Sequence, residues 1–135
     1  MRIVLDTNVL VSGLLSRDGP PGKIVQMVAG GTLVVCFEGR ILAEYRDVLS
    51  RPRFRFDPLE VARLLEQIEA DGEEVLTDPL TVRLTDRRDE PFLEVAVAAG
   101  AEFLVTGNLR HFPVSLRHGV AVVSPTAFIE ALRER

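Results

Sequence analysis

The chain has 135 residues, of which 47% are hydrophobic and 27% are charged. This composition excludes an intrinsically disordered chain, and the length predicts one domain spanning residues 1–135. The net charge of −4 gives no overall attraction to nucleic acid, so a nucleic-acid contact would need a local basic patch.

The single cysteine, Cys36, excludes an internal disulfide and is typical of a protein in the reducing cytosol. Asp6 interrupts the N-terminal apolar run, and no segment approaches the roughly 18 apolar residues of a membrane span. We therefore expect a cytoplasmic protein with no signal peptide and no membrane partner.

Apolar runs alternate with helical periodicities along the chain. Strands are expected over 3–5, 32–37, 102–105 and 120–123, with short extended pieces over 73–76 and 80–84. Helices are expected directly after the first strand, over 21–30, 39–50, 59–70 and 91–99, and from 125 onward. Because the strands are continuous apolar runs, the pattern predicts a parallel sheet covered by helices on both faces.

The first strand ends in Asp6, with Thr7 and Asn8 directly behind it. In open α/β sheets, ligands bind outside the carboxyl ends of the strands, so Asp6 is a candidate functional acid. An Asp after a strand is also an ordinary helix N-cap. The residue alone does not decide between these two roles.

Glu44 lies at the edge of the apolar arc of the third expected helix, about 40° from Val48 on a helical wheel. A carboxylate beside a buried face is uncommon, because burial without a partner is costly. The alternative is an ordinary Glu that extends to solvent or meets an arginine.

Asp89 precedes a helix that has Pro91 in its first turn, so an N-cap role is expected for it. It also falls on the core-facing side of that helix, which is compatible with a functional acid in a cleft. Glu90 and Glu94 are expected on the opposite, solvated side.

A second strand ends in Thr106, Gly107 and Asn108, which resembles the ending at Asp6. Two parallel strands would then present small polar groups at one edge of the sheet. Asn108 offers an amide oxygen to a water or a metal but adds no charge. The alternative is a plain turn.

Three carboxylates that converge at one sheet edge need protonation or a cation, because two charges about 4 Å apart repel by about 4 kcal/mol at an effective dielectric near 20. Oxygen ligands favour Mg²⁺ or Mn²⁺ over zinc, and such a site suits phosphate-ester hydrolysis. Two histidines and one cysteine do not make a convincing zinc site, and no serine-hydrolase elbow or nucleotide-binding glycine loop occurs.

Four segments together resemble the PIN-domain ribonucleases, which include toxins of bacterial and archaeal toxin–antitoxin pairs. The segments are VLDTNVLVS (4–12), ILAEYRDVL (41–49), DEPFLEVA (89–96) and VTGNLRHF (105–112). They occur in the family's order and spacing.

The resemblance implies a three-layer α/β/α sandwich and Mg²⁺- or Mn²⁺-dependent endonucleolytic cleavage of RNA. Asp6, Glu44 and Asp89 would form the catalytic and metal-binding acidic cluster, with Glu44 holding a ligand water or the nucleophile. The resemblance further implies a homodimer and a cognate antitoxin that occupies the acidic groove.

The resemblance also implies that small polar residues line the site beside the substrate, here Thr7, Asn8 and Thr106. Many members of the family carry an acid where this chain has Asn108, which we assign as a further metal ligand through its oxygen. The number of metal ions therefore stays open, and Glu90 or Asp86 are alternatives for completing the site.

Arginines near these positions are candidate contacts for RNA phosphates, and Arg110 is the one we assign to substrate binding. Arg87 and Arg88 are further candidates, and solvated surface arginines are the alternative. The alternating arginines and phenylalanines of segment 51–56 would extend the groove or form part of a dimer or antitoxin surface.

The competing interpretation is a non-catalytic PIN-like module that binds RNA or protein. Asn108, in place of an acid, is the residue that keeps this alternative open.

Overall fold

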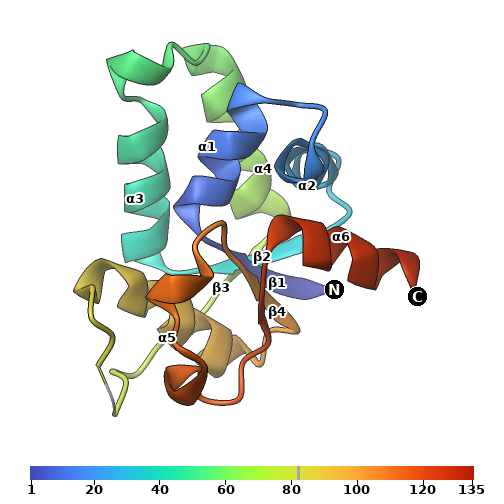
Figure 1. Cartoon of the computed structure of the whole chain (residues 1–135). Coiled ribbons are helices and arrows are strands. Elements are labelled where there is room, and N and C mark those ends of the chain that lie inside the picture. The colour runs from blue at the N-terminus through green and yellow to red at the C-terminus, as the bar shows by residue number, and fades with distance from the viewer. Residues whose placement is uncertain (82) are drawn as a thin grey trace.

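Five parallel strands form the centre of the computed structural model, which describes residues 1–81 and 83–135 (Figure 1). Their order across the sheet is β3-β2-β1-β4-β5, and each pairing is parallel. The strands are β1 (Arg2–Leu5), β2 (Val34–Phe37), β3 (Glu73–Glu74), β4 (Phe103–Val105) and β5 (Val122–Val123). The parallel sheet expected from the apolar runs is confirmed.

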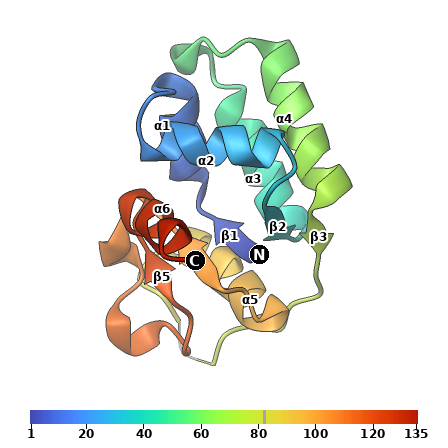
Figure 2. The same ribbon diagram turned by 90° about the vertical axis from the view of Figure 1, so that its right-hand side faces the viewer.

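Six helices of the described residues accompany this sheet. They are α1 (Thr7–Leu15), α2 (Pro20–Ala29), α3 (Gly39–Leu49), α4 (Pro58–Asp71), α5 (Glu90–Ala99) and α6 (Pro125–Arg133). Figure 1 shows α1, α3 and α4 on one side of the sheet and α5 on the other, and Figure 2 shows α6 next to α2. The expected three-layer α/β/α sandwich is confirmed. None of the helices in the described parts of the chain has the length and hydrophobicity needed to cross a membrane.

The central strand β1 supplies the middle of the core because helices pack on both of its faces. Ile3, Val4 and Leu5 are fully buried. Strand β4 lies beside β1 with Leu5 paired to Val105, so the two strands end at the same level. The polar residues that follow them are therefore neighbours, as the sequence predicted.

Tyr45 fixes α3 to the end of β1. Its ring is fully buried, and its hydroxyl donates a hydrogen bond of 2.5 Å to the carbonyl oxygen of Leu5. Burial, and then the charges of Asp6 and Glu44, hold the pKa of Tyr45 well above its usual value, so the hydroxyl keeps its proton. Glu44, the preceding residue on α3, is thereby held near Asp6.

Three of the extended segments expected from the sequence form shorter strands in the structure, or none in their described residues. Segments 73–76 and 120–123 contribute only the two-residue strands β3 and β5 at the edges of the sheet. An edge strand forms hydrogen bonds with one neighbouring strand only, so its paired part can be short. Segment 80–84 forms no strand in its described residues, and residue 82 of that segment lies outside the described residues.

The expectation that Glu90 and Glu94 are solvated is wrong. Both are buried, with 3% and 6% of their surface exposed. Glu90 accepts hydrogen bonds of 2.9 Å from Arg83 and from the amide of Leu84, and Glu94 pairs with Arg40 at 2.5 Å. Helical periodicity places side chains around one helix axis but does not show that distant arginines cover the outer face.

We expect the substitution Tyr45→Phe to lower the free energy of unfolding by about 1 kcal/mol, because it removes the donor to a buried carbonyl. Urea denaturation measures the change, and an unchanged slope of the transition would show that the folded state stays compact. An unchanged free energy of unfolding would contradict this role of the hydroxyl.

Candidate active site at the carboxyl edge of the sheet

A pocket of about 480 Å³ opens at the carboxyl end of β1, beside α1 and α3, and we call it the acid pocket. Its lining contains five carboxylates, three arginines and one histidine: Asp6, Glu44, Asp47, Asp86, Asp89, Arg51, Arg53, Arg88 and His111. The three acids proposed from the sequence thus lie around one pocket, although 83 residues separate Asp6 from Asp89 along the chain.

Asp6 is held by side chains from two strand ends. Its Oδ2 accepts a hydrogen bond of 2.8 Å from the hydroxyl of Thr106 and one of 3.4 Å from the amide of Asn8. Asp6 occupies the N-cap position of α1, but within the described residues its side chain makes no capping hydrogen bond to that helix. Burial raises the pKa of Asp6 above its usual value, the Thr106 hydrogen bond lowers it, and the charge of Glu44 raises it again.

Thr7 and Asn8 contact other parts of the protein. The hydroxyl of Thr7 donates to the carboxylate of Glu44, and Oδ1 of Asn8 accepts a hydrogen bond of 3.0 Å from the amide of Gly107. Both residues line the acid pocket, whereas Thr106 is fully buried beneath Asp6. These contacts give Thr7, Asn8 and Thr106 the role of positioning the acids.

Asp89 carries a buried oxygen without a hydrogen-bond partner. Its Oδ2 lies 3.0 Å from Nδ1 of His111, but among the described residues no group meets hydrogen-bond geometry with it. Burial, followed by the charge of Asp6, raises the pKa of Asp89 to about 6. A buried carboxylate oxygen without a hydrogen-bond partner is a suitable ligand for a cation.

The expected capping role of Asp89 is wrong. A 3-10 turn, Arg87–Asp89, precedes α5, so the backbone of Asp89 is already helical with φ −82° and ψ −19°. Within the described residues its side chain caps no helix. The sequence marks the start of α5 through Pro91 but does not show the extra turn in front of it.

His111 is the residue of the pocket that sequence reasoning missed. Its Nε2 lies 2.8 Å from the side-chain nitrogen of Asn108, and its Nδ1 faces Asp89. If the amide donates to Nε2, the ring proton sits on Nδ1, the nitrogen 3.0 Å from the carboxylate, although the two groups are not aligned for a hydrogen bond. The sequence does contain one signal: His111 is three residues after Asn108, and one helical turn places two such residues on the same side.

Asn108, Arg110 and Glu90 do not line the acid pocket. The amide of Asn108 donates 3.0 Å to the hydroxyl of Thr106, and Arg110 lies exposed on the 3-10 turn Leu109–His111. Asp86 does line the pocket, but both of its oxygens are engaged by Arg88. Asn108 as a metal ligand and Arg110 as a substrate contact therefore stay predictions.

The carboxylate oxygens of the acid pocket are the kind of ligand that a hard divalent cation prefers, but the side chains are not arranged to bind one in this structure. The oxygens come from carboxylates, one of them orphaned and buried. Across the described residues, no three acidic, histidine or cysteine side chains stand close enough together to hold an ion. Asp6, Glu44 and Asp89 would hold the ion only after side-chain rotations.

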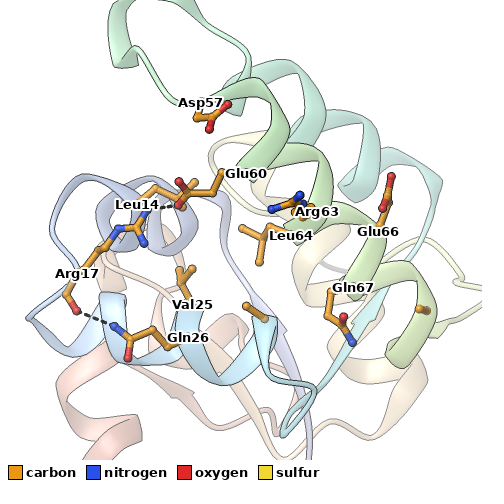
Figure 3. Close-up of a pocket in the computed structure, with 12 residues that line it drawn as sticks. Leu14, Arg17, Val25, Gln26, Asp57, Glu60, Arg63, Leu64, Glu66 and Gln67 are labelled. Atoms are coloured by element: carbon orange, nitrogen blue, oxygen red, sulfur yellow. Dashed lines mark hydrogen bonds and ion pairs between the residues drawn. The ribbon is translucent and has the colours of Figure 1, made fainter.

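A larger pocket of about 760 Å³ lies elsewhere, among α1, α2 and α4 (Figure 3). Apolar side chains such as Leu14, Val25 and Leu64 line it, and Arg17 forms an ion pair with Glu60 at its rim. The charges are thus partly paired, and the strand ends do not reach it. The smaller acid pocket is the better candidate for chemistry.

Comparisons with known proteins agree with this architecture. A family model described as a PIN domain matches residues 2–110. A chain of the crystal structure of VapBC2 from Rickettsia felis bound to a DNA fragment from their promoter is similar in structure, with a TM-score of 0.56. That match has 14% sequence identity and covers 92% of this chain and 98% of the other, so it concerns the fold alone. No curated protein matches the sequence.

We expect Asp89→Asn to raise the free energy of unfolding of the metal-free protein at pH 7.5 by about 1–3 kcal/mol. The pKa of Asp89 is about 6 in the folded protein and 3.8 without its surroundings, so above pH 6 the buried charge destabilises the folded state. The gain should shrink as the pH falls from 6 toward 3.8 and vanish below the unfolded pKa of 3.8, where Asp89 is protonated in both states.

Urea denaturation in a chelator at several pH values measures this difference. The matched control is Asp47→Asn, an exposed acid on the same pocket, for which we expect a change within about 0.5 kcal/mol. A destabilised Asp89→Asn variant at pH 7.5 would contradict the electrostatic account.

Proposed function

The chain belongs to the PIN-domain family, and from this membership we propose that it is a Mg²⁺- or Mn²⁺-dependent endoribonuclease. The observation that supports the proposal most is the orphaned, buried oxygen of Asp89 in a pocket that also contains Asp6 and Glu44. Removing such carboxylates from water without a partner is costly, and a cation offsets the cost.

We assign Asp6, Glu44 and Asp89 as the residues that hold the ion. A bound divalent cation would supply Lewis-acid chemistry, polarising the phosphodiester and offsetting the charge that develops on it. Thr106 and Asn8 orient Asp6, Thr7 orients Glu44, and His111 contacts Asp89. Positioning of this kind keeps the acids in place before substrate arrives.

Glu44 has the further role of orienting the attacking water. It is half-buried, lines the pocket, and pairs with no arginine in the described parts of the chain. Its carboxylate therefore keeps acceptor capacity beyond the hydrogen bond from Thr7.

We further propose that the protein is a homodimeric, cytoplasmic toxin neutralised by a cognate antitoxin. The fold-level similarity to a chain of the VapBC2 complex supports this proposal. A partner that places an arginine or a lysine in the acid pocket would also relieve the repulsion among its carboxylates.

The second candidate function is a non-catalytic module that binds RNA or protein. Asn108 favours it, because many family members have an acid there, and so does the lack of a ready ligand geometry among the described acids. A test of metal binding separates the two candidates.

We expect purified protein to cleave single-stranded RNA with Mg²⁺ or Mn²⁺ and not with a chelator, and Asp6→Asn to reduce cleavage at least about 100-fold. The substitution removes a metal-holding charge while the amide still accepts the hydrogen bond from Thr106. Gel analysis of labelled RNA measures the rate. Undiminished cleavage by a folded Asp6→Asn variant would falsify the assignment.

Metal binding is tested independently of cleavage. A cation at about ten times its dissociation constant stabilises the folded state by about 1.4 kcal/mol, which raises Tm by about 5 °C for a chain of this size. We expect this shift with Mn²⁺ for the native chain and for Asp47→Asn, but not for Asp6→Asn. No shift for any of the three proteins would favour the non-catalytic module, and equal shifts for all three would contradict the assignment of Asp6 as a metal ligand.

A further inference from the structure

The segment between α3 and α4 contributes part of the wall of the acid pocket. Arg51, Arg53 and Phe54 of this segment line the pocket. A 3-10 turn, Pro52–Phe54, holds them, with Phe54 N donating 3.1 Å to Arg51 O and Arg55 N donating 3.2 Å to Pro52 O. The wall is therefore a short, hydrogen-bonded turn, and its side chains project from a fixed backbone.

Arg53 differs from the other two arginines of the acid pocket. Arg51 pairs with Asp47 at 3.2 Å, and Arg88 pairs with Asp86 at 3.0 Å. Within residues 1–81 and 83–135, Arg53 has no carboxylate within ion-pair distance. Among the described residues, this cation of the pocket lining thus lacks a paired counter-charge.

Aromatic rings hold the guanidinium of Arg53 in its place. Its central carbon lies 4.8 Å from the ring centroid of Phe54, and that ring stacks on Phe56 with centroids 5.3 Å apart and planes 12° apart. A contact with a ring face orients the planar group and leaves its N–H donors available. These donors match the oxygens of a phosphate, which a guanidinium binds in a bidentate manner.

We propose that Arg53, supported by Phe54, binds a backbone phosphate of single-stranded RNA next to the bond that is cleaved. The inference rests on the proposed function and names a substrate-binding residue outside the acidic cluster. The acids are recessed, since Asp6 and Asp89 are only 6% and 8% exposed, so the strand has to enter the pocket. A single strand does this without loss of base pairs, and its bases stack on arginine planes and aromatic rings.

The test measures RNA binding in an Asp6→Asn background with Mg²⁺, so that cleavage does not interfere. Fluorescence anisotropy follows a labelled 12-nucleotide single-stranded RNA over a range of salt concentrations. We expect Arg53→Ala to weaken binding about tenfold and to reduce the slope of log affinity against log salt by about 0.7, the value for one phosphate contact to a single strand. Arg53→Lys should restore the slope but only part of the affinity, because it keeps the charge and loses the planar stack.

The matched control is Arg63→Ala on α4, another exposed arginine, which should change affinity less than twofold. Because Arg53 is exposed, its loss should leave Tm unchanged. Unchanged affinity or salt slope in Arg53→Ala would overturn the proposal, as would failure of the background variant to bind RNA. A loss of binding to a protein partner with RNA binding intact would also overturn it.

A second measurement keeps this inference distinct from the proposed function. With Asp6 present and Mn²⁺ bound, Arg53→Ala should raise KM for the 12-nucleotide RNA about tenfold more than KM for the small diester bis(p-nitrophenyl) phosphate, which has no neighbouring phosphate for Arg53 to bind. An equal loss on both substrates would overturn the binding role of Arg53. If neither substrate is cleaved, the nuclease proposal fails, and the anisotropy result still decides the role of Arg53.

Discussion

The structure depends on one electrostatic constraint: carboxylates are buried together at the end of the central strand. Burial is the largest cause that raises the pKa of both Asp6 and Asp89; the charge of Glu44 raises that of Asp6 further, and the charge of Asp6 raises that of Asp89. A protein under selection for stability alone would replace one of them by a neutral residue. The unpartnered, buried oxygen of Asp89 is what gives the pocket a capacity for a cation.

The rest of the fold serves to hold that arrangement in place. Parallel pairing of β1 with β4 puts Thr106 beside Asp6, and the buried hydroxyl of Tyr45 fixes α3 to Leu5. These contacts are made by the protein itself, so the acids are brought together before any ion or substrate binds. The same parallel topology explains why residues 100 positions apart share a hydrogen bond.

Much of the architecture could be predicted because apolar runs and helical periods are local properties. The end of β1 at Leu5 and the helix behind it follow directly from the switch between apolar run and polar residues. The burial of Glu94 could not be predicted, since it depends on Arg40 reaching across from another helix. Periodicity carries no information about such partners.

In the candidate site, too, the features set by local sequence could be predicted and those that depend on loop conformation could not. Acids at strand and helix ends were identified because their positions relative to the expected elements are visible in the sequence. The contact of His111 with Asp89 was missed, because it depends on how the loop after β4 folds back. The cap expected at Asp89 was wrong because a 3-10 turn precedes α5. Loop conformation, which apolar patterning leaves undetermined, accounts for both errors.

The most direct test of the account is a crystal structure of the protein grown with Mn²⁺, with anomalous scattering measured to locate the ion. The account predicts an anomalous peak in the acid pocket with carboxylate oxygens of Asp6 and Asp89 within about 2.0–2.6 Å, the range for hard divalent cations. It also predicts that the side chain of Glu44 turns toward the ion or toward its water. An acid pocket without a peak, at a Mn²⁺ concentration that supports RNA cleavage, would contradict the central claim.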